Sequence, residues 1–405
     1  MMTDRNVFEK ADFLVGNMEF VERIPDMPAR KPFDEETCLF LNHVSRRIMG
    51  DKRSRKYSDV ISFAFWIREA SLNQMKNRFD DSDRVFRLGR GTVFHIAPSN
   101  VPVNFAYSLT AALLTGNNSI VRIPTRPFEQ VDLISDAVKA AIQEVDGMKG
   151  RICLVRYGHH KEVNDLFSSI ADVRIIWGGD ATIAQVRQSP LPPRSTEVTF
   201  ADRYSLAVID AEAYLRLENK EQVAQDFYND TYFTDQNACT SPRIVVWTGN
   251  HIEEARGHFW GDLNRLVSKK YVFQDIQGVH KLTNAYLLAS EQDGVLIEPR
   301  EDNLVFRVKI NSPDTQFMDK MGNSGYFFEY ECYDLTDLKD LCDDKRCQTI
   351  SYVGNPDMFD TLLDAGIKGV DRIVPVGKTM DFDLFWDGYD LYSCLTRVVA
   401  VSYNL

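Results

Sequence analysis

The sequence contains no run of apolar residues that approaches the roughly 20 needed for a membrane-spanning helix. Its first residues, MMTDRNVFEKADF, lack the apolar core of a secretory signal. We therefore expect a cytoplasmic protein without a membrane span. Basic residues are outnumbered as well: 47 Lys and Arg face 59 Asp and Glu, for a formal net charge of −12. This excess of acid argues against a nucleic-acid partner, although it leaves room for a local basic pocket that binds an anionic cofactor.

A disulfide framework and a zinc site are also missing from the pattern. The seven cysteines are an odd number and lie scattered, at positions 38, 153, 239, 332, 342, 347 and 394. In a reducing compartment we expect them to be free thiols. Cys342 and Cys347 have the wrong spacing for a zinc knuckle, and no histidine lies near them in the sequence. We therefore expect no metal site.

The chain has 405 residues, 44% hydrophobic and 26% charged, which is typical of a globular protein with two domains or a large α/β unit with an appended one. From residue 90 onward, strand-like runs alternate with amphipathic helices. The expected strands are 90–98, 119–124, 151–158, 172–179 and 205–210, with helices at 104–116, 128–145, 161–169 and 181–188. This alternation predicts right-handed βαβ units, a parallel sheet and therefore a Rossmann-like domain.

A second α/β domain is expected in the other half of the chain. A Pro- and Ser-rich linker at 189–197 precedes it, and its predicted elements are a helix at 219–230, a strand at 243–249, a helix at 252–268 and a strand at 303–310. The tail, 395–405, is predicted to be an edge strand without a sequence neighbour. Such strands often pair with another domain or subunit.

One thiol stands in an unusual setting, within YFTDQNACTSPRIVVW (232–247). Cys239 follows a polar turn with Asp235 and Gln236, and it precedes Pro242 and a β-branched strand. A nucleophilic thiol needs donors that lower its pKa and a nearby amide that holds a developing oxyanion. The alternative is a small buried side chain without chemistry. The residues alone leave both interpretations open.

Polar and basic residues follow two of the predicted strands in HIAPSNVPVNFAYSLTAALLTGNNSIVRIPTR (95–126). Asn100 comes after the first strand, and Arg122 and Arg126 stand at the end of the second. Taken singly, Asn100 is a strand-to-helix cap and the two arginines form a solvated strand end.

Several motifs together resemble one family. From about residue 85 to the C-terminus, the segments HIAPSNVPVNFAYSLTAALLTGN, IIWGGD, EVTFADRYSLAVID, DQNACTSP, QTISYVGN, GVDRIVPVGKTMDFDLFWDGYDL and LTRVVA resemble, in this order, the LuxC-type long-chain fatty-acyl-CoA reductases of bioluminescent bacteria, which are part of the aldehyde dehydrogenase superfamily.

The resemblance implies an aldehyde-dehydrogenase-like fold with two Rossmann-like α/β domains and a C-terminal oligomerisation strand. We therefore expect four parts. These are an N-terminal helical segment (1–80) joined to the cofactor domain, a dinucleotide-binding domain (81–205), a catalytic domain (206–375), and a tail with the oligomerisation strand (376–405).

The resemblance also implies the catalytic roles. Cys239 is similar in position to the superfamily's nucleophile, and the glutamine usual shortly before it is Gln236. Asn100 matches the asparagine whose side-chain amide forms the oxyanion hole with the backbone N–H of the cysteine.

For the cofactor, the resemblance implies that Gly178 and Gly179 meet the pyrophosphate at a helix N-terminus, and that Arg122 lies at or next to the residue that contacts the adenine ribose. Arg122 and Arg126 would neutralise a 2′-phosphate, which favours NADPH over NADH and agrees with the family's preference. The expected cofactor-binding residues are Pro98, Ser99, Arg122, Thr125, Arg126, Gly178 and Gly179.

Two departures from the superfamily matter. Aldehyde-oxidising members carry a glutamate in Glu-Leu-Gly-Gly-Lys that activates the hydrolytic water, whereas Thr199 holds that position here and Glu197 is two residues away. Without a water-activating base, a thioester intermediate should survive to exchange with a thiol or accept hydride. The Glu-x-Phe motif that grips the nicotinamide ribose is not recognisable, and we do not assign its role to Glu329, the nearest candidate.

Weaker candidates remain. His95, His159 and His160 are possible acids or bases, but we interpret them as capping or surface residues. The segment WDGYDL (386–391) either packs against the protein or borders an acyl channel, and packing is the preferred interpretation.

The resulting hypothesis is an NADPH-dependent reductase that converts an acyl-CoA, or an acyl thioester delivered by a partner, to the aldehyde through an acyl-cysteine on Cys239. NADH is the alternative cofactor. The resemblance implies a LuxE-like acyl-protein synthetase as partner and a homo-oligomer. The alternatives are a CoA-acylating aldehyde dehydrogenase and, in another class, a non-catalytic acyl carrier or assembly subunit.

Overall fold

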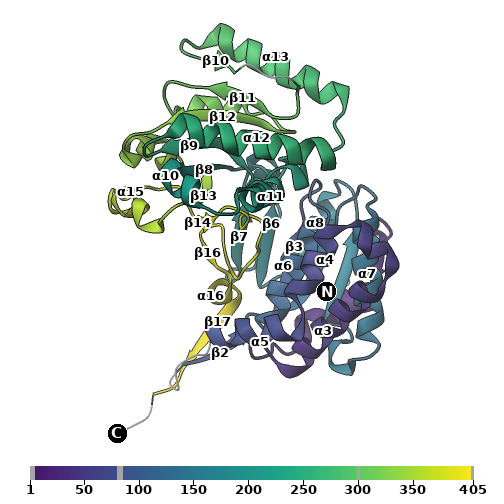
Figure 1. Cartoon of the computed structure of the whole chain (residues 1–405). Helices are drawn as coiled ribbons and strands as arrows, with labels where there is room; N and C mark the ends of the chain where they lie inside the picture. Colours follow the sequence, from purple (N-terminus) through teal and green to yellow (C-terminus); the bar gives the residue numbers. More distant parts are fainter. Residues whose placement is uncertain (1–4, 80–84, 299–301, 403–405) are drawn as a thin grey trace. The chain divides into compact units, whose positions relative to one another are not determined.

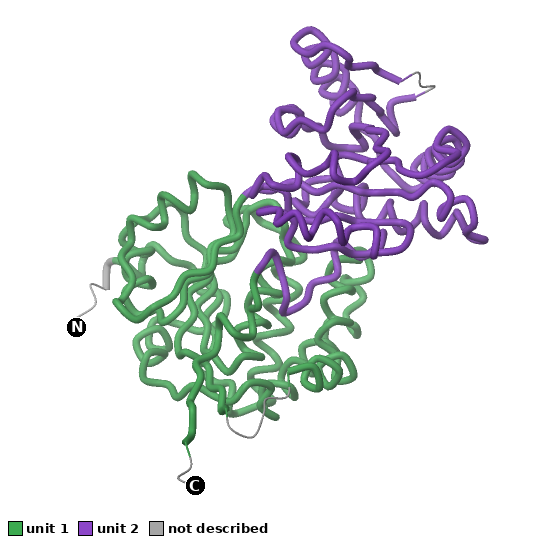
Figure 2. Tube along the Cα trace, turned by 90° about the vertical axis from the view of Figure 1, so that its left-hand side faces the viewer, with its two compact units in different colours: residues 1–201, 389–405 green, residues 202–388 purple. Residues whose placement is uncertain are grey.

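The computed structural model of the chain describes residues 5–79, 85–298 and 302–402 (Figure 1). The chain divides into two compact units (Figure 2). Unit 1 contains residues 1–201 and 389–405, and unit 2 contains residues 202–388. The polypeptide thus enters unit 2 once and returns to unit 1 once. Each unit is described by itself below.

A six-stranded sheet forms the centre of the described part of unit 1, in the order β1-β5-β4-β3-β6-β7. The strand β1 is antiparallel to β5, and the other neighbours run parallel. The predicted parallel sheet is therefore confirmed. The strands are β1 (Asp12–Val15), β3 (Thr92–Ile96), β4 (Asn118–Arg122), β5 (Ile152–Arg156), β6 (Val173–Trp177) and β7 (Thr196–Phe200).

The strand order of this unit creates a switch point, where neighbouring connections leave the sheet in opposite directions. The chain runs outward from β3 through β4 to β5, then crosses back to β6 and β7 on the other side of β3. Such an order has a switch point between β3 and β6, and ligands of open α/β sheets bind beyond the carboxyl ends of the strands there. The strand β3 is buried along its whole length, as expected for a strand covered on both faces.

Helices cover this sheet and connect its strands (Figure 1). The longest is α3, whose Asp34 N-cap accepts a hydrogen bond from the backbone N–H of Thr37. The helices are α1 (Arg5–Phe8), α2 (Met18–Arg23), α3 (Glu35–Gly50), α4 (Ser58–Trp66), α5 (Glu69–Arg78), α6 (Asn104–Leu114), α7 (Glu129–Ile142), α8 (Lys161–Ser169), α9 (Asp180–Val186) and α16 (Leu391–Leu395). The helix-rich character predicted for residues 1–80 is therefore confirmed where the structure describes them.

Two strand expectations for unit 1 need correction. The predicted linker 189–197 is partly wrong, because Thr196 and Glu197 begin β7, which is paired along its length with β6. The tail strand β17 (Thr396–Ala400) is not solitary: it pairs antiparallel with β2 (Val85–Gly89) in the same unit. In both cases the strand pairs with a distant segment, and the local sequence does not reveal that pairing. The strand β16 (Tyr389–Asp390) also belongs to this unit.

Unit 2 contains a seven-stranded sheet in its described part, in the order β10-β11-β12-β9-β8-β13-β14. Only β10 is antiparallel to its neighbour among these pairs. A second α/β unit is therefore confirmed. The strands are β8 (Tyr204–Asp210), β9 (Pro242–Thr248), β10 (Leu296–Ile297), β11 (Phe306–Lys309), β12 (Tyr326–Glu331), β13 (Cys347–Val353) and β14 (Arg372–Pro375), with β15 (Phe385–Trp386) outside the sheet.

Aromatic packing holds helices onto one face of this sheet. Phe227 on α11 packs 5.0 Å from Phe259 on α12, and Trp260 lies 5.2 Å from Phe327 on β12, measured between ring centroids. Burial of this kind stabilises by about 3–5 kcal/mol per large aromatic side chain lost to alanine. The helices of unit 2 are α10 (Ala211–Arg216), α11 (Lys220–Asp230), α12 (Ile252–Lys270), α13 (Asp275–Glu291), α14 (Lys339–Asp343) and α15 (Asp360–Asp364). No helix in the described ranges combines the length and apolarity needed to cross a bilayer.

Candidate active site

Cys239 lies in unit 2, in the loop between the 3₁₀ turn Tyr232–Thr234 and β9. Cys239 as a whole residue is half-buried. The carbonyl oxygen of Cys239 accepts a hydrogen bond of 2.8 Å from the hydroxyl of Ser205 at the start of β8. The loop is thereby tied to the amino edge of the sheet.

Gln236 fixes the shape of this loop from inside. Its side chain is fully buried, and its backbone has a positive φ of 52°, which is uncommon for a residue other than glycine. The amide oxygen accepts from the backbone N–H groups of Gly325 and Tyr326, and the amide nitrogen donates to the carbonyls of Pro242 and Tyr326. The glutamine that the resemblance singled out is therefore a structural clamp for the loop that carries Cys239.

A buried arginine supports the same loop. The guanidinium of Arg243, on β9, donates to the carbonyl oxygens of Gln236 and Gly322 and to the side chain of Asn323. Burial lowers the pKa of Arg243 to about 10, so the group stays cationic at neutral pH, and the Cys239 sulfur is close enough to influence it. Arg243 is a cation that sequence reasoning missed, because only the fold brings it to the loop.

The surroundings of the sulfur do not make it a ready thiolate. Burial raises the pKa of the Cys239 thiol to about 12, and the negative charge of Asp387 adds to this effect. The Gln348 side chain and the backbone N–H groups of Cys239 and Thr240 act in the opposite direction, but they are the smaller influences. The donors that a nucleophile requires are present, yet the thiol is protonated at neutral pH. The donors lower the pKa of the thiol, but the effect of burial outweighs them.

The expected cofactor residues gather at the carboxyl edge of the unit 1 sheet. Pro98, Ser99 and Asn100 follow β3, Thr125 and Arg126 follow Arg122 at the end of β4, and Gly178 and Gly179 follow β6. Since β4 and β6 flank β3, the three segments meet at the switch point of the sheet. Ser99, Asn100, Thr125 and Arg126 are exposed there.

The two arginines of this edge are free to meet an anion. The guanidinium of Arg122 lies 4.7 Å from the centre of the Tyr157 ring and donates to the carbonyl of Gly158 at 3.2 Å. Arg126 lies 5.2 Å from the centre of the Phe128 ring. Within the described residues, the contacts of the two arginines are with aromatic rings and a backbone carbonyl, and none is with a carboxylate. Unpaired guanidinium groups suit phosphate.

The glycine pair makes a tight entry into α9. A Cβ atom on Gly178 would lie 3.0 Å from the Cγ2 atom of Thr182, so a larger residue would disturb the strand-to-helix turn. Gly179 is the N-cap of α9, and Asp180 begins that helix. The acidic Asp180 opposes an anion at this terminus, so the arginines at β4 carry most of the electrostatic fit. Together, these residues fit a phosphate-bearing dinucleotide.

Thr199 occupies the position of the superfamily's water-activating glutamate and has no carboxylate. Thr199 lies on β7, paired with Ile176 on β6. The carboxylate of Glu197 is bound by Arg174 at 2.8 Å and by Arg187 at 2.7 Å, and is therefore occupied. Neither residue offers a free base to a water molecule.

Glu329 is also a structural residue. Its carboxylate is almost fully buried on β12 and accepts hydrogen bonds from the indole N–H groups of Trp247 and Trp260. Arg256 and Arg307 balance its charge at 3.4 and 3.1 Å. These contacts account for the burial of the Glu329 carboxylate without a cofactor, and we assign it no ribose-binding role.

The histidines differ in environment. His95 is fully buried, with Nδ1 2.8 Å from the hydroxyl of Ser108 and Nε2 3.3 Å from that of Ser119. Burial lowers the pKa of His95 to about 3, so the ring stays neutral. His160 precedes α8 and lies 3.8 Å from Glu162 at the surface. His95 is therefore a core residue rather than a cap.

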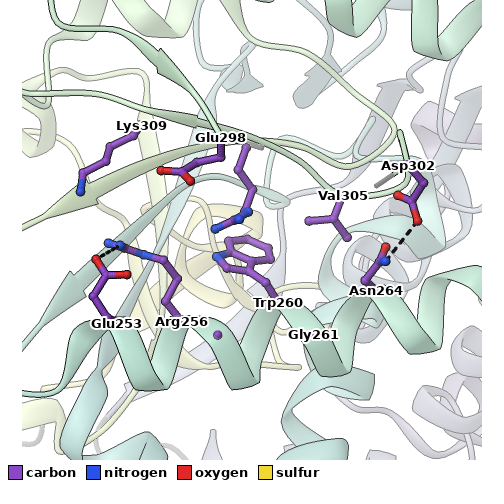
Figure 3. A pocket seen from close by; sticks show the side chains of 11 residues that line it. Glu253, Arg256, Trp260, Gly261, Asn264, Glu298, Asp302, Val305 and Lys309 are labelled. Carbon is purple, nitrogen blue, oxygen red and sulfur yellow. Dashed lines mark hydrogen bonds and ion pairs between the residues drawn. The ribbon is translucent and has the colours of Figure 1, made fainter. Parts of the chain in front are cut away.

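A polar pocket opens beside α12, away from any of the predicted site residues (Figure 3). Its cations are already paired: Arg256 with Glu253, Arg307 with Glu329, and Lys309 with Glu331. Figure 3 also shows Asn264 bonded to Asp302 at 3.1 Å. The pocket is therefore lined by ion pairs that already neutralise these cations, and we do not interpret it as a second anion site.

The segment WDGYDL contributes an unforeseen carboxylate. Trp386 is buried beneath the guanidinium of Arg372, which lies 4.1 Å from the centre of a Trp386 ring. Asp387, the next residue, is 4% exposed. The segment was expected to pack against the protein, which holds for Trp386. The burial of the Asp387 carboxylate was not expected. The Asp-Gly pair was an available signal for a tight turn.

Known proteins resemble the chain in sequence. The model of the family described as "Acyl-CoA reductase (LuxC)" matches residues 17–399. A long-chain acyl-protein thioester reductase of Vibrio harveyi is 25% identical over 309 residues, which cover 72% of this chain and 60% of that protein. The counterpart of Aliivibrio fischeri is 30% identical over 168 residues, 40% of this chain and 33% of that protein. The chain thus spans less than two thirds of the length of these relatives.

Solved structures resemble it in fold. An NAD-dependent benzaldehyde dehydrogenase from Corynebacterium glutamicum superposes with a TM-score of 0.63 over 94% of this chain and 88% of that chain, at 14% identity. The predicted aldehyde-dehydrogenase-like fold with two Rossmann-like α/β units is therefore confirmed.

Proposed function

Because the chain belongs to the LuxC family of acyl-CoA reductases, we propose that it reduces an acyl thioester to the aldehyde through an acyl-cysteine formed on Cys239. The observation that carries this proposal is the placement of Cys239. This half-buried residue stands on a loop that hydrogen bonds of Gln236, Arg243 and Ser205 tie to the amino edge of a parallel sheet. A cysteine that merely filled the core would need no such support.

The fate of the acyl group follows from the missing base. Thr199 has no carboxylate, and the carboxylate of Glu197 is bound by two arginines. Water attack on a thioester is slow without general-base help, which is typically worth 10²–10⁴-fold in rate. The acyl-cysteine therefore persists until a reductant or a thiol reacts with it. This supports a reductase, or in the reverse direction a CoA-acylating dehydrogenase, over an enzyme that forms a free acid.

The cofactor proposed for unit 1 is NADPH, which supplies hydride to the acyl carbon when bound. Pro98, Ser99 and the glycine pair would border the dinucleotide, and Arg122, Thr125 and Arg126 would face its adenosine phosphate. The two arginines lack carboxylate partners within the described residues, which supports a cofactor with an additional phosphate over NADH. Asn100 would hold the oxyanion together with the backbone N–H of Cys239.

The acyl donor and the cellular compartment are proposed from the family alone. The acyl group would come from acyl-CoA or from a LuxE-like acyl-protein synthetase that docks on the reductase, in the cytoplasm. The antiparallel ribbon of β2 and β17 carries the exposed Phe86 and Val398, which supports a homo-oligomer built on this ribbon.

Intact-protein mass spectrometry after incubation with a series of acyl-CoAs tests the proposal. The wild type should gain one acyl group, and NADPH should remove it with a matching loss of absorbance at 340 nm. Cys239→Ser should gain no stable thioester, whereas Cys394→Ser, a change at another half-buried cysteine, should behave as wild type.

The rival functions give different results. An acyl carrier would label on Cys239 and consume no NADPH. A cysteine that only fills space would leave activity intact in Cys239→Ser. Either outcome would replace the proposed reductase with the corresponding alternative.

A further inference from the structure

Four parallel strands of unit 2 bring their amino ends together near Cys239. The register places Pro242 of β9 opposite Ser205 of β8, Ser205 opposite Thr349 of β13, and Thr349 opposite Arg372 of β14. Cys239 stands three residues before Pro242, and Gln348 stands immediately before Thr349. Residues distant in sequence therefore lie side by side in one row at this edge of the sheet.

Asp387 lies in a tight turn beside the start of β14. The guanidinium of Arg372 is 4.1 Å from a ring of Trp386, and a Cβ atom on Gly388 would lie 2.5 Å from Oδ1 of Asp371. Asp387 and Gly388 both have positive φ, of 50° and 77°, as in a type I′ turn, where Asp-Gly is a preferred pair. The turn holds the aspartate side chain in the interior, at 4% exposure. Its Oδ1 atom is buried without a hydrogen-bond partner among the described residues. A buried carboxylate oxygen without a partner is costly, which marks it as a candidate for chemistry.

The charges that face Asp387 are engaged elsewhere. Arg372, on β14, donates to the carbonyls of Thr379, Lys378 and Asp381. Arg203 donates to Asp371 at 2.7 Å. Both arginines lower the pKa of Asp387, and the charge of Asp371 raises it. The ion pair of Arg203 is with Asp371, and neither arginine forms an ion pair with Asp387. The carboxylate is thus electrostatically supported while its oxygen stays available.

Gln348 links the aspartate to the thiol. Its side chain is fully buried, and neither its amide nitrogen nor its amide oxygen has a hydrogen-bond partner within the described residues. Yet the same amide lowers the pKa of both Asp387 and the Cys239 thiol, and the charge of Asp387 acts on that thiol as well. The geometry agrees with this. Gln348 borders Thr349, which lies opposite Ser205, the residue that donates to the Cys239 carbonyl. On its other side Thr349 lies opposite Arg372, whose guanidinium covers Trp386, the neighbour of Asp387.

We propose that Asp387 is the general base that accepts the thiol proton of Cys239 during acyl transfer. The inference rests on the proposed reductase function. As the sulfur of Cys239 bonds to the acyl carbon, its proton passes to the Asp387 carboxylate, and the bond from the acyl carbon to the donor's sulfur breaks. The protonated Asp387 then gives this proton to the departing thiolate. The step yields acyl-Cys239, a free donor thiol and the original carboxylate, so atoms and charge balance.

The protonation states favour this route over a preformed thiolate. A thiol with a pKa near 12 is almost entirely protonated at pH 7, and the carboxylate beside it makes its free ionisation harder still. Burial raises the pKa of Asp387 to about 6, which leaves it mostly ionised at pH 7 yet more basic than an ordinary aspartate. A base with a pKa near the working pH is the most effective partner for proton transfer.

The substitution Asp387→Asn separates a base from a structural residue, because two reactions of Cys239 should respond in opposite directions. Acylation by an acyl-CoA without NADPH, followed by mass spectrometry at pH 7, should slow by about a hundredfold or more. Alkylation by iodoacetamide uses only the thiolate, and removal of the negative charge should make the thiolate easier to form. Its rate at pH 7 should therefore stay equal or rise.

Two controls make the outcome decisive. Asp381→Asn changes an exposed carboxylate of the preceding loop, paired with Lys378, and should alter neither rate. In the wild type, acylation should rise with pH through about 6, as Asp387 ionises. This measurement needs no variant and holds even if Asp387→Asn folds poorly.

Three results would overturn the inference. An equal loss of acylation and alkylation in Asp387→Asn would make the residue structural, and an unchanged acylation rate would exclude it as the base. A wild-type profile that rises only above pH 9 would do the same. By contrast, a wild type that is never acylated would refute the proposed function itself.

Discussion

The side-chain amide of Gln236 pairs with the backbone of Tyr326 as a neighbouring strand would. Its oxygen accepts from the Tyr326 N–H at 3.0 Å, and its nitrogen donates to the Tyr326 carbonyl at 3.2 Å. The same amide also bonds to Gly325 and Pro242. One side chain therefore joins the loop that carries Cys239 to the start of both β12 and β9.

Gln236→Leu should destabilise unit 2 by about 3 kcal/mol or more, since four backbone groups would lose their buried partner and each such loss typically costs about 1–3 kcal/mol. Urea denaturation measures the change. Gln222→Leu, at an exposed position of α11, is the matched control and should shift stability by less than about 0.5 kcal/mol. Equal effects of the two changes would contradict the clamp.

His95 should make the protein sensitive to acid. Its pKa falls from 6.5 to about 3 on folding, so below pH 6.5 the unfolded chain binds a proton that the folded chain does not. Stability should therefore fall as pH falls from 6.5 towards 3, by about 1.4 kcal/mol per pH unit from this residue. Above pH 6.5 the effect is absent.

His95→Gln tests this expectation through the slope of stability against pH, not its absolute level. The variant should lose the His95 contribution between pH 6.5 and 4, while His258→Gln, at an exposed position of α12, should keep the wild-type slope. A slope in His95→Gln equal to that of the wild type would show that the ring is protonated in the fold.

Glu197 should matter for stability and not for the fate of the acyl group. Glu197→Gln leaves the buried Arg174, which is 3% exposed, without its carboxylate, a loss typically worth about 3–5 kcal/mol. The lifetime of acyl-Cys239 in water, followed by mass spectrometry, should not change. A much longer lifetime in the variant would identify Glu197 as the base for hydrolysis after all. Glu162→Gln, which removes an exposed ion pair with Lys10, is the stability control.

Arg126 should distinguish the two nicotinamide cofactors. Arg126→Ala removes an exposed guanidinium at the end of β4, so NADPH should bind about tenfold more weakly while NADH binding stays the same. Fluorescence titration of each cofactor measures this without catalysis. Arg194→Ala, at another exposed arginine of unit 1, should leave both affinities unchanged. An equal loss for both cofactors would place the arginine away from the 2′-phosphate.

Local patterns were sufficient to predict the elements that are buried on both faces. The segments around Val93, Ile120, Leu154 and Ile175 are short and rich in β-branched and aromatic residues, so their strands were predictable, and the alternation with helices implied a parallel sheet. The strands β2 and β7 were not foreseen. Their residues become strands through pairing with distant partners, β17 and β6, and neither has a continuous apolar run.

By itself, the sequence determined the α/β class, the family and the position of Cys239, because periodicity and ordered motifs are properties of neighbouring residues. Only the tertiary structure decided what surrounds the sulfur. Gln348 and Asp387 stand 109 and 148 positions further along the chain. The order of the parallel strands places Gln348 on β13, and the turn between β15 and β16 places Asp387. The protonation state of the thiol depends on those neighbours and on burial, so no local pattern could have predicted it.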